Sequence, residues 1–326
     1  MSPGAREAAA RAAGAGWSDA ADAAIAGDIA TALAYATPAG GAVVAPITTV
    51  GVRDRRAGTV MFTTSLAFGR KLERIRREDR VALAFHARDH GFAAGTAFVL
   101  AQGRAEIGWT DPAAQGAALA DGVQRFFGPP KSGRFWSRWM REYYVQRVPV
   151  TVFVERVETW PDPPGGGAPD VHGAPAPATA AASQPSPQGG AEPRVPARRA
   201  ARRLRRLPHL LLGWVGPDGF PAVAPVAVER ADRDGLELLD PTGSVPQGKR
   251  RAGLVGHRFG PGLTGLRAQQ HTGWLQAGEE GIRYAPHTEQ RYRTPRSETG
   301  TLLVNGWQAK RGMRRARRDA ASEAAR

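Results

Sequence analysis

Short apolar runs, separated by turns rich in glycine and proline, recur along most of this chain. Their period predicts six strands in the first half, at 31–37, 42–49, 58–64, 80–86, 96–107 and 148–160. Helical spacing predicts helices at 18–30, 69–77, 111–127 and 132–146, the first with Ser18 as its N-cap. Because strands predominate and do not alternate regularly with helices, the pattern indicates a small barrel or an α+β fold rather than a doubly wound sheet.

A low-complexity stretch rich in proline, alanine and glycine interrupts the pattern at 161–193. Such a composition buries too little apolar surface to fold, so it predicts a flexible linker. The chain then divides into a helical N-terminal extension, a first barrel, a disordered linker with a basic end, a second barrel-like domain and a basic tail. Their expected bounds are 1–30, 31–160, 161–207, 208–308 and 309–326.

The second half repeats features of the first at a constant offset in residue number. Leu33 matches Leu212, Pro46 matches Pro225, and Ser65 matches Ser244 without a gap. The same offset aligns the basic helix start at 69–71 with positions 248–250. This self-similarity predicts a duplicated domain, with a helix over 250–257 in the second copy.

The net charge of +15 raises the question of nucleic-acid binding. Two short segments, 194–206 and 310–318, supply thirteen of the fifteen excess charges. We interpret them as solvated basic tails, which argues against a nucleic-acid partner. Binding of polyanions through these two segments stays open as an alternative function.

Other features of the sequence bear on the cellular location of the protein. The chain has no cysteine, which excludes disulfides and thiolate metal sites and fits a reducing cytoplasm. No run of about 18 apolar residues is present, so no membrane span is expected. The N-terminus lacks the apolar core of a signal peptide. We therefore expect a cytoplasmic protein without a membrane partner.

One stretch of the first half carries candidate chemistry. A strand ends in Phe62-Thr63-Thr64-Ser65, and after a short loop a helix opens with Arg70 and Lys71. Hydroxyls, the free N–H groups of a helix start and two cations are the donors that a phosphate group prefers. The pattern predicts a phosphate-binding site there.

This stretch resembles the phosphate-binding segment of the pyridoxamine 5′-phosphate oxidase-like split barrels. The strand at 99–106 and the hairpin strand at 42–49 are similar to neighbouring strands of that family. The resemblance implies a mainly β fold of α+β type, with two six-stranded Greek-key split β-barrels in tandem and peripheral helices. It also implies a cofactor phosphate near Thr63, Thr64, Ser65, Arg70 and Lys71, beside Phe62. The cofactor ring would then lie against Ala45, Pro46 and Ile47.

The resemblance further implies a flavin cofactor, FMN, with the deazaflavin F-420 as the alternative and heme after both. The expected function is an FMN- or F-420-dependent oxidoreductase acting on a small organic substrate; the alternative is a non-catalytic flavin- or heme-binding protein. Two barrels would pack as an intramolecular pseudo-dimer or as a homodimer. Phe98 stands where true pyridoxamine 5′-phosphate oxidases have glutamine, and 42–49 lacks their arginine, so that activity is not expected. No catalytic residue can be assigned.

The second copy keeps part of the candidate site. Its counterparts, Thr242, Ser244, Lys249 and Arg250, define a second candidate site. The dipeptide at 240–241 introduces a proline into the strand, and glycines weaken the expected helix. A degenerate half that supplies an interface is therefore favoured. Histidines 257, 271 and 287 lack metal-binding spacing, and no metal is expected.

Overall fold

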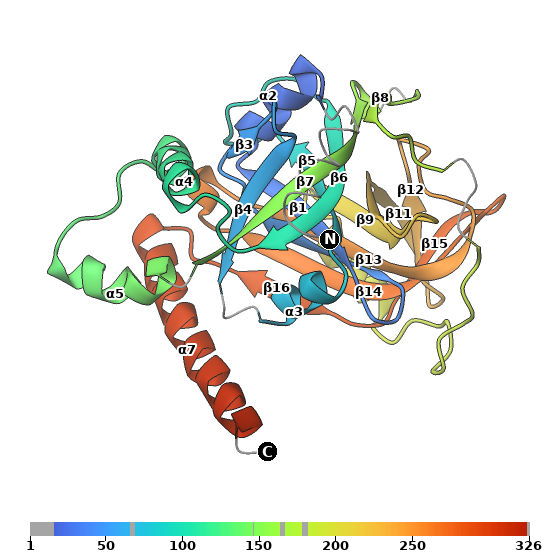
Figure 1. The fold of residues 1–326 in the computed structure, drawn as a ribbon. Coiled ribbons are helices and arrows are strands. Elements are labelled where there is room, and N and C mark those ends of the chain that lie inside the picture. The colour runs from blue at the N-terminus through green and yellow to red at the C-terminus, as the bar shows by residue number, and fades with distance from the viewer. Residues whose placement is uncertain (1–15, 66–68, 146, 164–166, 178–181, 325–326) are drawn as a thin grey trace.

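The computed structural model describes residues 16–65, 69–145, 147–163, 167–177 and 182–324. The first half folds into one curled antiparallel sheet with the strand order β2-β1-β5-β6-β7-β4-β3, and β8 pairs with β7 (Figure 1). Its strands are β1 (Ala30–Ala36), β2 (Ala42–Ile47), β3 (Arg53–Asp54), β4 (Thr59–Ser65), β5 (Arg80–Ala87), β6 (Phe98–Ile107), β7 (Arg147–Trp160) and β8 (Asp170–Gly173). Its helices are α2 (Asp19–Gly27), α3 (Gly69–Arg77), α4 (Pro112–Phe127) and α5 (Arg134–Val145).

Alternation along these strands places one apolar face inside the first barrel. Val60 and Phe62 of β4 and Leu83 of β5 are buried there with Leu72 of α3. Helix α2 starts at the predicted cap, where the Ser18 hydroxyl accepts a hydrogen bond from a backbone N–H. The apolar face of α2 is buried in the same core, so this helix is part of the barrel. Positions 1–15 of the expected N-terminal extension lie outside the described residues.

The second half forms a sheet of the same topology. Its order is β10-β9-β13-β14-β15-β12-β11, and β16 pairs with β14. The strands are β9 (His209–Val215), β10 (Pro221–Pro225), β11 (Ala227–Ala231), β12 (Leu236–Leu239), β13 (Gly248–Arg258), β14 (Arg267–Gly278), β15 (Gly281–Pro286) and β16 (Gln290–Arg293), with a 3₁₀ turn, η3, at Pro261–Leu263. The tandem-barrel prediction is confirmed, although each sheet has eight strands in place of six.

The offset between the two copies holds for the first hairpin and then changes. Strands β9 and β10 begin at the positions that the sequence alignment matches to the starts of β1 and β2. Strand pairing, however, makes Leu254 of β13 the counterpart of Leu83 of β5, whereas the offset of the first hairpin, continued along the chain, would match Leu83 with Gly262. No helix separates β12 from β13, a stretch that the structure describes in full, so a deletion of α3 explains the change. The predicted helix over 250–257 is wrong, because this segment forms part of β13.

The segment predicted as a disordered linker contains regular structure in its described part. Strand β8 extends the first sheet, and α6 (Ala197–Leu204) buries Ala197, Ala200, Ala201 and Leu204 against the second barrel. The arginines at 198, 199 and 202 lie on the opposite side of α6, outside this core. An amphipathic helix therefore replaces the expected basic tail. The second basic segment lies within α7 (Glu298–Ala324), which packs against α5.

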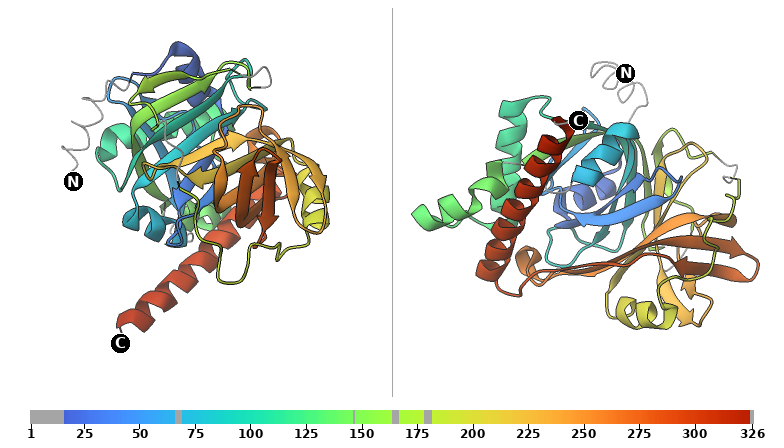
Figure 2. Two further views of the ribbon diagram at one scale, coloured as in Figure 1. Left: turned by 90° about the vertical axis from the view of Figure 1, so that its right-hand side faces the viewer. Right: turned by 90° about the horizontal axis from the view of Figure 1, so that it is seen from below.

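The two barrels pack against each other where β2 contacts β9, β13 and β14, and where β10 contacts β1, β5 and β6 (Figure 2). A shared apolar cluster joins residues of both halves, and its members include equivalent positions, such as Val44 with Val223 and Ala84 with Val255. Two amides bridge the seam: Gln102 donates to the Pro221 carbonyl at 2.6 Å, and Gln270 donates to the Val44 carbonyl at 2.5 Å. The two halves of this single chain are therefore related by pseudo-two-fold symmetry.

Two histidines, one from each barrel, meet at the seam. His86 lies at a register shift in the pairing of β5 with β1, His257 of β13 is paired with His209 of β9, and the Nε2 atoms of His86 and His257 lie 2.7 Å apart. The His86 Nδ1 donates to the Ala84 carbonyl, so in the neutral form its Nε2 accepts from His257. Burial is the largest cause that lowers the pKa of both rings, that of His86 to about 3. Both imidazoles are therefore neutral at pH 7.

Candidate anion-binding site

The end of β4 presents hydroxyls on two different faces. Thr63 and Ser65 point to the outer face of the barrel, where both are half-buried. Phe62 and Thr64 belong to the inner face, with 1% and 4% of their surface exposed. Of these four predicted residues, the structure leaves only Thr63 and Ser65 able to contact a ligand from outside.

Arg147 completes this outer face, and sequence reasoning missed it. It opens β7 directly opposite Ser65, so both side chains share one face of the sheet. Its guanidinium donates to the Thr63 carbonyl at 3.4 Å and lies 4.5 Å from the centre of the Tyr143 ring, whose hydroxyl it also contacts. No local motif marks Arg147, because only strand pairing brings it to Ser65.

The two predicted cations behave differently. Lys71 is half-buried, and burial together with the nearby Arg147 charge lowers the pKa of its ammonium group to about 8. Arg70 is exposed at the start of α3. A cation whose pKa is lowered by a neighbouring cation is one that a bound anion would stabilise. The structure thus places Lys71 near Arg147, whereas Arg70 lies at the exposed edge of the candidate site.

The predicted ring-binding residues lie on β2, at the opposite end of the strand order from β3 and β4. Ala45, Pro46 and Ile47 are half-buried. The Ile47 side chain packs against the core of the first barrel. By alternation, Pro46 lies on the face that Val44 turns toward the second barrel. Only Pro46 of the three is turned toward the seam between the barrels.

A cavity of about 410 Å³ lies between the barrels. Three arginines from separate elements line it: Arg74 of α3, Arg194 before α6 and Arg251 of β13. His287 also lines it, and burial, with contributions from Arg194 and Arg251, lowers the pKa of its ring. The volume is in the range of small-molecule sites. The cavity adds a second cationic environment within reach of α3.

The residues of the second candidate site do not form a comparable arrangement. The Thr242 hydroxyl donates to Asp240 at 2.6 Å and lies 2.7 Å from the Ser244 hydroxyl. The Asp240 carboxylate also accepts two backbone N–H groups of this loop. Lys249 is exposed at the start of β13, whereas Arg250 is 1% exposed and donates to the Gln247 carbonyl. The Asp240 carboxylate therefore already accepts the hydrogen bonds that a bound anion would need.

Two other kinds of site are absent from the described residues. No group of three or more His, Cys, Asp or Glu side chains in this part of the chain is arranged to hold a metal ion. Among the described helices, none combines the length and apolar character needed to cross a membrane.

Comparison with known proteins gives a likeness in structure only. No family model matches the chain, and no curated protein matches it. Among solved structures, a conserved hypothetical protein from Mycobacterium tuberculosis is 21% identical, with a TM-score of 0.33, over 44% of this chain and 85% of its own. A putative pyridoxamine 5′-phosphate oxidase from Listeria innocua is 12% identical (TM-score 0.29; 41% and 90%). A FAD-binding protein from Mesorhizobium loti is 18% identical (TM-score 0.29; 42% and 88%).

Proposed function

We propose that this chain binds a phosphorylated flavin, FMN or the deazaflavin F-420, and acts with it as an oxidoreductase on a small organic substrate. The observation that carries the proposal is the pairing of Lys71 with Arg147 beside the outward hydroxyls of Thr63 and Ser65. The resemblance of 60–71 to a flavin-phosphate segment supports the same assignment.

The donor set fits a phosphate group. Arg147 offers a planar fork of N–H donors, Lys71 adds a point charge, and the two hydroxyls can donate to further oxygens. A phosphate dianion would offset the repulsion between the two cations and raise the pKa of Lys71 from about 8.

In this proposal the protein's own residues bind and orient, and the flavin supplies the hydride chemistry. Lys71 and Arg147 hold the phosphate at the end of β4. Pro46, which faces the seam, provides an apolar surface on which a ring can rest. The cavity lined by Arg74 and Arg251 provides a place for an acidic substrate or for an acidic extension of the cofactor.

The test is FMN and F-420 binding to the full-length protein and to Lys71→Ala, measured by absorbance after removal of unbound ligand and by titration calorimetry. Each lost charged hydrogen bond contributes about 1.5–3 kcal/mol, so Lys71→Ala should weaken binding about ten- to a hundredfold. Arg76→Ala removes an exposed charge from the same helix and serves as the matched control, with unchanged affinity expected.

The variants also separate the alternatives. Loss of binding in Arg251→Ala, with normal binding in Lys71→Ala, would place the phosphate between the barrels and overturn this assignment. Flavin binding without turnover of any reductant would favour a non-catalytic flavin-binding protein. Failure of the folded wild-type protein to retain either cofactor would refute the proposed function.

A further inference from the structure

Three arginines stand side by side across the second sheet. Arg258 of β13 is paired with Arg267 of β14, which in turn is paired with Arg293 of β16. Residues directly opposite each other on antiparallel strands share one face, so these three side chains leave the sheet on the same side. Adjacent strands are about 4.8 Å apart, and the row therefore spans about 10 Å.

This row of arginines is an unfavourable arrangement of cross-strand neighbours. Like charges directly opposite each other destabilise a sheet, and here two such pairs occur in succession. Within the part of the chain that the structure describes, no carboxylate forms an ion pair with these three arginines. The Glu289 carboxylate lies 4.0 Å from Arg291 instead. The charged neighbours that lower the pKa of Arg267 are all arginines, at positions 258, 293 and 296.

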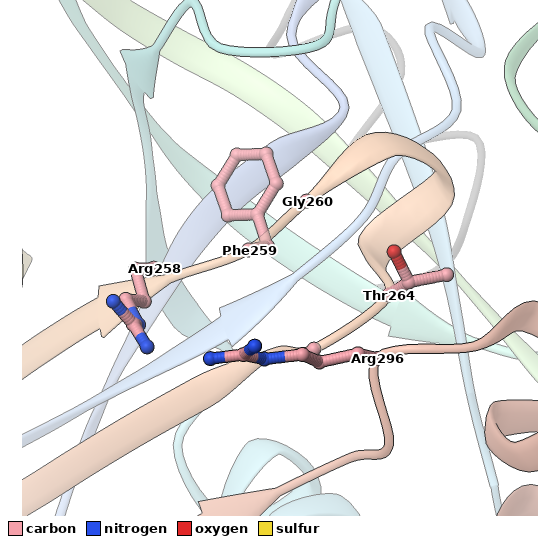
Figure 3. Close-up of a pocket in the computed structure, with 6 residues that line it drawn as sticks. Arg258, Phe259, Gly260, Thr264 and Arg296 are labelled. Carbon is pink, nitrogen blue, oxygen red and sulfur yellow. The ribbon is translucent and has the colours of Figure 1, made fainter.

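A cavity of about 340 Å³ lies at this end of the second barrel. Arg258 and Arg296 line it with Phe259, Thr264 and two glycines. The Arg296 side chain extends toward Arg258, whereas the Phe259 ring points away from the two arginines (Figure 3). Arg296 follows β16, and Arg258 is the last residue of β13. Since Arg258 also begins the arginine row, the cavity and the row form one cationic surface.

We propose that this end of the second barrel is a binding site for a small oligophosphate. The residues that contact it are Arg258, Arg267, Arg293 and Arg296. A single phosphate reaches only one neighbouring pair of arginines, whereas a chain of linked phosphates can follow the row. Each guanidinium can bind two phosphate oxygens through its fork of donors.

The site is distinct from the one at Lys71, because its residues all come from the second half of the chain. It also differs from the arginine runs at 194–206 and 310–318, because the residues that line this cavity lie between 258 and 296. A ligand here would neutralise a repulsion that is built into the sheet register.

The test is calorimetric titration of the full-length protein with inorganic tripolyphosphate and with orthophosphate at equal ionic strength. Tripolyphosphate should bind at least tenfold more tightly than orthophosphate. Arg267→Ala should weaken tripolyphosphate binding at least tenfold. Arg230→Ala is the matched control: it removes one exposed arginine, paired with Glu237, from the same barrel, and should leave affinity unchanged. Lys71→Ala should also leave it unchanged.

Three results would overturn the proposal. The first is an equal loss in Arg267→Ala and Arg230→Ala, which would show attraction to net charge alone. The second is loss in Lys71→Ala without loss in Arg267→Ala, which would place the anion in the first barrel. The third is binding of a single-stranded oligonucleotide through Arg267 with no binding of tripolyphosphate, which would indicate a nucleic-acid surface.

Discussion

The contact between His86 and His257 at the seam of the two barrels makes the stability of this protein depend on pH. His257 has no exposed surface, and its Nδ1 has no hydrogen-bond partner among the described residues. Burial, with His86 and His209 nearby, lowers the pKa of His257 well below 6.5. In the unfolded chain the pKa of the same ring is about 6.5. As pH falls below 6.5, the unfolded state takes up a proton that the folded state does not bind, and the free energy of unfolding decreases.

The magnitude follows from proton linkage. Each unit of pH below 6.5 removes about 1.4 kcal/mol per excluded proton, so His257 alone accounts for about 2 kcal/mol between pH 6.5 and pH 5. His86 acts in the same direction down to about pH 3. Asp28 opposes them, because burial raises its pKa to about 7 against the effect of Arg88. The wild-type curve is therefore a sum of opposing contributions, and a difference between variants isolates His257.

The perturbation is His257→Gln, which keeps an N–H donor toward His86 and removes the titrating ring. Urea unfolding followed by tryptophan fluorescence at pH 8, 6.5, 5.5 and 5 gives the free energy of unfolding of each protein. The difference between wild type and variant should shift by about 2 kcal/mol in favour of the variant between pH 6.5 and pH 5. His172→Gln, on β8 outside the seam, controls for the loss of one imidazole. A difference that stays constant from pH 8 to pH 5 would refute the reasoning.

Three further outcomes are expected. Affinity for FMN should fall as pH rises above about 8, where Lys71 loses its proton, and this decline should vanish in Lys71→Ala; fluorescence titration across pH 6–9.5 measures both. Gly103→Ala should destabilise the fold by about 1–3 kcal/mol or more in urea unfolding, because its Cβ would lie 2.1 Å from the Phe153 carbonyl oxygen. Trp160→Ala, at a seam residue only 4% exposed, should cost about 3–5 kcal/mol, and unchanged stability would show that the apolar cluster shared by the barrels contributes little.

The strands and helices of the first barrel could be predicted from sequence because their apolar period is clear. Helix α3 was predicted with its observed bounds, and β4 and β5 to within one residue at each end. The second barrel was harder, since a deletion moves the repeat out of register after the first hairpin. Positions 250–257 then fell opposite a helix, although they form a buried central strand of the second sheet. A short apolar run does not distinguish these two states.

The candidate site was predicted in part. Lys71, Thr63 and Ser65 belong to one local motif, and spacing alone was enough to find them. Phe62 and Thr64 were included because a motif does not show which face of the strand each residue takes. Arg147 could not be found, because α4 and α5 separate it from Lys71 along the chain. Its place depends on the pairing of β4 with β7, which no local pattern encodes.

The loss of α3 from the described part of the second half has a consequence for how such a chain can change over evolution. In a dimer of identical subunits, every substitution appears twice, and a helix deleted from one subunit is deleted from both. Joining the two barrels in one chain removes that constraint. One half can keep the helix that carries Lys71, while the other gives it up and acquires a row of arginines along its sheet. The two halves of this molecule are free to specialise.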